Sequence, residues 1–144
     1  MEYREILRWP LWLWLFLAFL ASSLSLAVWA ALGIKSSIVI SLAQLLLLII
    51  FERASALKIS VTPEWLFVGR AKIERKYLDE IAELRAKELQ QARGPNLDPA
   101  AYLALRFWAN SGLRISLSDP RDRTPYWLIS SRNATKLSAA LAKD

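Results

Sequence analysis

The side chains that carry most acid–base, nucleophilic and metal chemistry are scarce in this chain. It has no histidine and no cysteine, which excludes a histidine general base, a Ser-His-Asp triad, a thiol nucleophile and a Cys/His zinc site. The four glycines form no phosphate-binding loop. The acids that remain as candidates fall in expected turns or on exposed faces: Glu64, Asp79, Glu80, Asp98, Asp119 and Asp122. We therefore expect no enzyme, no cofactor and no metal site.

Charge divides the chain into an apolar part and a polar part. Of the 19 basic and 13 acidic residues among 144, 27 lie after residue 51, and residues 9–34 carry none. We expect three segments. Residues 1–8 form a cytoplasmic N-terminal segment, residues 9–53 form a transmembrane helical hairpin, and residues 54–144 form a cytoplasmic β domain.

Two apolar runs define the expected hairpin. Residues 11–32 form a helix of about 33 Å, enough to cross the ~30 Å hydrocarbon core. Residues 36–51 would span roughly 24 Å, which suffices if Lys35 reaches the surface and the bilayer thins. The alternative is a cleaved signal peptide, but its apolar core is usually only about 7–15 residues. The short link at 33–36 favours an antiparallel hairpin.

Basic residues predict the orientation of the hairpin. Arg4 and Arg8 precede the first helix, Arg53 and Lys58 follow the second, and the connection carries only Lys35. We expect a multi-pass protein of the plasma membrane with both termini in the cytoplasm.

Small and polar residues on the two helices form a candidate packing face. Ser22 and Ser25 share one face of the first helix, and Ser41 and Gln44 share one face of the second, with Gln44 expected level with Ser25. Such residues permit close helix approach and interhelical hydrogen bonds. The face either holds the hairpin together or docks another membrane protein.

From residue 54 the hydrophobic period changes to two, which is typical of half-buried strands. We expect seven strands in meander order, a short helix at 86–93 and a C-terminal amphipathic helix. The expected strands cover residues 57–62, 65–69, 71–77, 81–85, 102–108, 113–118 and 126–130.

The run from Ile59 to Gly69 resembles the opening hairpin of bacterial PH-like membrane proteins, which often carry two transmembrane helices before the barrel. Tyr3-Arg4-Glu5 and the stretch Thr124-Pro125-Tyr126-Trp127 are similar to an uncharacterised actinobacterial membrane-protein family, domain of unknown function 3093. The resemblance implies a two-helix hairpin followed by a mainly β PH-like barrel. It implies no activity. Another small β-roll is the alternative fold.

Two clusters are candidate binding sites in the β domain. The first is a basic strand that faces either anionic lipid or only solvent: Arg70, Lys72, Arg75 and Lys76. The second is either a partner-docking edge or a closing hairpin with Tyr126 or Trp127 in the core: Arg106, Trp108, Arg121, Arg123, Tyr126, Trp127 and Arg132.

The expected function is that of a membrane-anchored, non-catalytic scaffold that presents a PH-like domain to a protein partner or anionic lipid. The alternative is a small accessory subunit of a membrane enzyme or transporter, docked through the Ser/Gln helix face. Expected partners are membrane lipids and either another protein or further copies of the chain. A pI of 9.9 does not indicate nucleic acid, because positive-inside membrane proteins share that bias.

Overall fold

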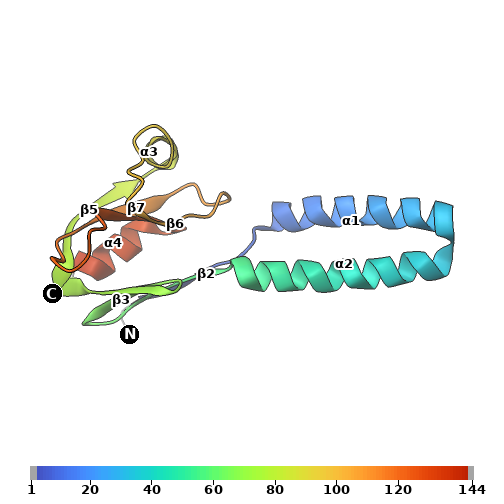
Figure 1. Cartoon of the computed structure of the whole chain (residues 1–144), viewed down its shortest axis with the longest axis horizontal. Coiled ribbons are helices and arrows are strands. Elements are labelled where there is room, and N and C mark those ends of the chain that lie inside the picture. Colours follow the sequence, from blue (N-terminus) through green and yellow to red (C-terminus); the bar gives the residue numbers. More distant parts are fainter. Residues whose placement is uncertain (1–2, 143–144) are drawn as a thin grey trace. The chain divides into compact units, whose positions relative to one another are not determined.

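The computed structural model describes residues 3–142 and divides the chain into two compact units (Figure 1). Residues 8–56 form a helical unit. Residues 3–7 and 57–142 together form a β unit. The short N-terminal segment therefore belongs to the β unit, although the helical unit separates the two in sequence.

The helical unit is a hairpin of α1 (Leu11–Leu32) and α2 (Ile34–Ser55). Gly33 alone connects them, with a φ of +84° that favours glycine. Both helices are long and apolar enough to cross a membrane. Most of their leucine, isoleucine and phenylalanine side chains are exposed, which is unusual for a water-facing helix.

The second helix is longer at both ends than the predicted run 36–51, and the predicted four-residue link shrinks to one glycine. The helical hydrogen bonds of α2 continue through its polar end. The last of them runs from the Ala56 N–H to the Glu52 carbonyl. At this open end of the hairpin, Trp9 Nε1 donates to Ser55 Oγ at 2.6 Å. Arg8 and Glu52 form an ion pair at 4.0 Å.

The β unit contains two four-stranded sheets. The first is antiparallel, in the order β1 (Tyr3–Leu7), β2 (Leu57–Val61), β3 (Trp65–Val68) and β4 (Ala71–Glu74). The second has the order β5 (Leu78–Leu84), β7 (Gly112–Leu117), β8 (Tyr126–Ser130) and β6 (Tyr102–Ala104), with β6 parallel to β8. A single 3₁₀ turn, Arg75–Tyr77, links β4 to β5.

Two helices complete the β unit. The C-terminal helix α4 (Ala134–Ala142) buries Leu137 and Leu141 in a core shared with the inner faces of the sheets. The short helix α3 (Ala86–Ala92) places Leu89 in a smaller cluster with Tyr126 and Leu128. Strand β8 contributes to both clusters, so all five of its residues are buried.

The structure corrects three expectations about this unit. Strand β1 was not anticipated. The strand predicted at 102–108 ends at Ala104, because the Arg106 N–H donates to Ser130 Oγ and the Ala109 N–H closes a turn onto the Arg106 carbonyl. The meander order is wrong, because β5 pairs directly with β7 and β6 lies at the sheet edge.

The expected PH-like barrel is not confirmed. Hydrogen bonding leaves two separate sheets among the described residues, without closure into a barrel. The coarser expectation holds: two long apolar N-terminal helices precede a sheet-rich region that ends in a helix.

Candidate functional site

The solvent side of the first sheet combines basic and aromatic side chains. Leu57, Ile59 and Val61 are buried, and the side chains between them point to the opposite face because strand residues alternate. Arg4, Ser60, Phe67 and Lys72 are successive register partners across the four strands. We name the exposed surface the basic–aromatic face and define it by Arg4, Lys58, Trp65, Phe67 and Lys72.

Contacts within this face hold its aromatic rings beside its cations. Lys72 Nζ lies 5.0 Å from the centre of the Trp65 ring, and the Trp65 and Phe67 rings are 6.5 Å apart. Phe67 is 38% exposed. Glu74, the register partner of Trp65, adds an acid to this side of the sheet, but its carboxylate is paired with Lys76. The face is therefore a positive surface that also carries the exposed Phe67 ring and the half-buried Trp65 ring.

The predicted basic cluster is divided by the structure. Lys72 lies on the basic–aromatic face, and Arg70 is exposed in the turn between β3 and β4. Lys76 instead pairs with Glu74, and the hydrogen bond that its ammonium donates to this carboxylate raises the Lys76 pKa. The four side chains therefore do not form one patch, because the chain leaves the strand for a 3₁₀ turn at Arg75.

Arg75 binds the backbone of the C-terminal helix. Its Nη2 donates to the carbonyls of Ala140 and Leu141 at 3.2 and 3.0 Å. Its Nη1 donates to the carbonyls of Thr62 and Pro63 at 3.4 Å. The last carbonyls of a helix have no partner within the helix, and a cation there is favoured by the helix dipole. Arg75 therefore stabilises the fold.

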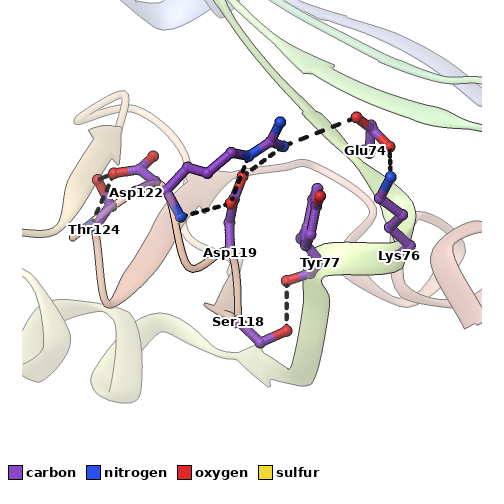
Figure 2. Close-up of polar contacts among 8 residues, drawn as sticks. Glu74, Lys76, Tyr77, Ser118, Asp119, Asp122 and Thr124 are labelled. Atoms are coloured by element: carbon purple, nitrogen blue, oxygen red, sulfur yellow. Dashed lines mark hydrogen bonds and ion pairs between the residues drawn. The ribbon is translucent and has the colours of Figure 1, made fainter.

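A polar network joins the β7–β8 loop to the turn after β4 (Figure 2). Arg121 makes two bonds to the Asp119 carboxylate, Nε–Oδ1 at 3.1 Å and Nη2–Oδ2 at 3.2 Å. Its Nη2 also lies 4.0 Å from Glu74. Arg121 and Lys76 lie 5.0 and 4.8 Å from the centre of the Tyr77 ring. We name this network the loop clip.

Ionisation in the loop clip follows these contacts. Hydrogen bonds from the Arg121 side chain and backbone lower the pKa of Asp119, and the Asp119 carboxylate raises the pKa of Arg121. The clip therefore brings Lys76 from one predicted cluster together with Arg121 from the other. This relationship could not be predicted from the sequence, because Lys76 and Arg121 lie far apart in it.

The predicted docking edge is not assembled. Tyr126 and Trp127 are only 5% and 4% exposed, so neither is available as an interface anchor. Trp127 packs 4.9 Å from the Tyr102 ring, and Tyr126 accepts a hydrogen bond from the Asp98 N–H. Both aromatics lie in the core, as one of the two interpretations expected, because β8 is covered on both faces.

The other members of the predicted edge are dispersed. Arg121 belongs to the loop clip, and Arg123 is exposed in the same loop. Arg106 and Arg132 donate their backbone N–H groups to Ser130 Oγ and Glu5. Trp108 is half-buried, and its Nε1 is buried without a hydrogen-bond partner.

The helical unit contains the predicted polar face as a groove between α1 and α2. Its volume is about 530 Å³, and its lining includes Ala18, Ala21, Ser22, Ser25, Ser41 and Gln44. Ser25 and Ser41 hydroxyls are hydrogen-bonded at 2.8 Å, and Ser37 Oγ donates to the Ser25 carbonyl at 2.8 Å. These bonds hold the hairpin together, as one interpretation of the face predicted.

The register of this face differs from the prediction. Ser25 is bonded to Ser41 and Ser37 rather than standing level with Gln44. The single-residue link at Gly33 shifts the second helix relative to the longer turn that was expected. Both polar atoms of the Gln44 amide are buried without a hydrogen-bond partner.

Glu5 is the important polar residue that sequence analysis missed as a site. Its carboxylate accepts hydrogen bonds from Ser131 Oγ at 2.6 Å, the Arg132 N–H at 2.8 Å and the Tyr3 hydroxyl at 2.9 Å. The β-forming residues Tyr3 and Ile6 around it were the available indication of a strand. Within residues 3–142, no group of three Asp or Glu side chains is placed to hold a metal ion.

These observations define a protein with two long apolar helices and a sheet-rich unit whose first strand precedes them. The chain belongs to the family described as protein of unknown function (DUF3093), whose family model matches residues 2–141. No curated protein and no solved structure matched the chain in the comparisons.

Proposed function

We propose that this protein is a membrane-anchored, non-catalytic binding module whose β unit presents the basic–aromatic face to anionic lipid head groups. In this proposal α1 and α2 cross the plasma membrane and both termini are cytoplasmic. The observation that carries it is that Arg4, Lys58 and Lys72 share one sheet face with the half-buried Trp65 ring and the exposed Phe67 ring.

The composition of this face suits the surface of a cytoplasmic leaflet. Each basic residue near an anionic leaflet contributes roughly 1 kcal/mol of attraction. Tryptophan favours the interfacial region, where its ring is partly apolar and its N–H can reach water. Three cations and two aromatic rings therefore bring electrostatic attraction and a preference for the membrane interface together on one sheet face.

The short links to the helices support lipid as the partner. Strand β1 ends at Leu7 and α1 begins at Leu11, while α2 ends at Ser55 and β2 begins at Leu57. A link of three residues extends to about 10 Å at most. The β unit therefore remains within a short distance of any membrane that the helices cross.

Charge distribution supports the proposed orientation. Arg8 and Arg53 flank the open end of the hairpin, whereas Lys35 is the basic residue near its closed end. By the positive-inside rule this charge bias supports a cytoplasmic position for the open end and for the β unit that follows it.

Fluorescence quenching of the full-length protein in nanodiscs tests the lipid contact. The nanodiscs contain either phosphatidylcholine alone or added phosphatidylglycerol, with brominated acyl chains as quenchers. We expect phosphatidylglycerol to increase quenching of Trp65, measured as the difference between the parent chain and Trp65→Phe. The double variant Lys58→Gln/Lys72→Gln should lose this increase, and added salt should weaken it.

A matched pair of lysines provides the control. Lys87 on α3 and Lys136 on α4 are exposed and lie outside the basic–aromatic face, so Lys87→Gln/Lys136→Gln removes the same charge without altering that face. Equal loss in both double variants would contradict a specific contact. A Trp65 contribution independent of phosphatidylglycerol would reject anionic lipid as the partner.

A further inference from the structure

Gln44 is a polar side chain of the hairpin whose amide has no hydrogen-bond partner within the hairpin. The hydroxyls of Ser22, Ser25, Ser37 and Ser41 all have hydrogen-bond partners within the two helices. The Gln44 Nε2 and Oε1 atoms are both buried and have none. A buried polar group without a partner is costly, and a lipid environment supplies no water to replace it.

The unsatisfied amide belongs to the lining of an open groove, and several of the other lining residues are small. Gln44 shares the lining of the 530 Å³ groove with Ala18, Ala21 and Ser22. Alanine and serine allow a second helix to approach closely. Glutamine has three rotatable side-chain bonds, so its amide can turn from the interior of the hairpin to the mouth of the groove.

We propose that a second copy of this chain covers the groove, with the two Gln44 amides hydrogen-bonded to each other across a two-fold axis. The inference rests on the proposed membrane insertion. A carboxamide needs a partner that both donates and accepts, and a second carboxamide meets this need through two reciprocal N–H···O=C bonds. A two-fold interface places the same surface on both partners.

Depth in the membrane favours a second copy over an unrelated helix. A two-fold axis along the membrane normal holds Gln44 of both copies at the same depth without further constraint. An unrelated helix would need its own donor and acceptor at that depth, opposite a face of small residues. The self-complementary arrangement therefore requires no feature beyond those of this chain.

Disulfide cross-linking tests the interface without background, because the chain has no cysteine. The probe is Ala21→Cys in the groove lining, expressed as the full chain in native membranes and oxidised with copper phenanthroline. The control is Leu46→Cys, which lies close to Gln44 in sequence but is 60% exposed and outside the groove lining. We expect a cross-linked dimer with Ala21→Cys and little with Leu46→Cys.

Gln44→Met then tests the amide, since methionine keeps the side-chain length and removes both hydrogen-bonding atoms. We expect the Ala21→Cys dimer to fall by roughly tenfold, equivalent to about 1.4 kcal/mol. Native mass spectrometry of the cysteine-free parent chain in mild detergent provides a second measurement, with a dimer expected that Gln44→Met weakens.

Three outcomes would overturn the proposal: equal cross-linking at both positions, a dimer unaffected by Gln44→Met, or cross-linking of Ala21→Cys to a different membrane protein. Failure of membrane insertion is recognised separately, because alkaline extraction would then release the chain from the membrane. Failure of lipid binding appears only in the Lys58/Lys72 experiment.

Discussion

The Ser131 hydroxyl donates a 2.6 Å hydrogen bond to the Glu5 carboxylate, although the two residues are 126 positions apart. Ser131 is fully buried, and its oxygen also accepts from the Asn133 N–H just before α4 begins. Glu5 thereby ties the strand that precedes the helical unit to the start of the last helix. The membrane-candidate hairpin is thus an insertion into the β unit.

Replacing Glu5 with Gln should destabilise the β unit. The partners of this carboxylate, Ser131 Oγ, the Arg132 N–H and the Tyr3 hydroxyl, all act as donors. An amide NH₂ would leave at least one of them unpaired, which costs about 1–3 kcal/mol. Thermal unfolding of the full chain in detergent, followed by circular dichroism, measures the loss. Arg4→Gln on the other face of β1 is the control, and equal midpoints for both variants would contradict the assignment.

Tyr3 should titrate late in alkali. Burial, followed by the hydrogen bond to the Glu5 carboxylate, raises its pKa to about 12. Between pH 10 and 12 the unfolded chain has lost this proton while the folded chain retains it. The contribution to stability is therefore complete below pH 10 and falls as the pH rises towards 12. Phenolate absorbance of the parent chain minus that of Tyr3→Phe isolates this residue, and a midpoint near 10 would refute the prediction.

Arg75→Gln should weaken the fold and leave the lipid contact unchanged. The guanidinium bonds four backbone carbonyls, including Ala140 and Leu141 at the end of α4. Bonds to a charged group contribute about 1.5–3 kcal/mol, so we expect a loss of this order. Urea unfolding in detergent and the quenching assay, performed on the same variant, separate the two roles. If a fully stable Arg75→Gln protein showed reduced quenching by anionic lipid, Arg75 would have to be assigned to the lipid site after all.

Acid should release the loop clip. Arg121 lowers the pKa of Asp119 below 3.8, whereas the unfolded chain retains the ordinary value. The contribution of this pair to stability is present above pH 3.8 and disappears as the pH falls through the folded-state pKa. Carboxyl NMR titration should show the Asp119 midpoint moving upward in Arg121→Gln. The neighbouring Arg123→Gln should leave it unchanged, and an equal shift in both would indicate a general charge effect.

Local patterns predicted the regular elements well because each depends on residues near in sequence. The apolar runs indicated both long helices, and the alternation Leu57, Ile59, Val61 indicated β2. The ends of the elements were less predictable. Gly33 can form the whole link through its positive φ, and the chain turns at Arg75, whose side chain binds α4.

The candidate sites depended on pairings that no local pattern contains. Lys72 and Arg75 are three residues apart, yet one lies on an exposed face and the other caps a helix. Lys76 and Arg121 are far apart and belong to one network. Tyr126 and Trp127 resemble interface anchors in sequence but are buried by α3 on one side and the main core on the other.

Sequence alone determined the partition into an apolar hairpin and a polar β region, because hydrophobicity and side-chain period are properties of neighbouring residues. It also determined that chemistry based on histidine or cysteine is absent, since the chain contains neither residue and composition does not depend on folding. The tertiary structure decided that Glu5 binds the residues just before the last helix, that Arg4, Lys58 and Lys72 share a face, and that the Gln44 amide has no partner. Each of these results depends on strand register or helix register, which is set by contacts between distant segments.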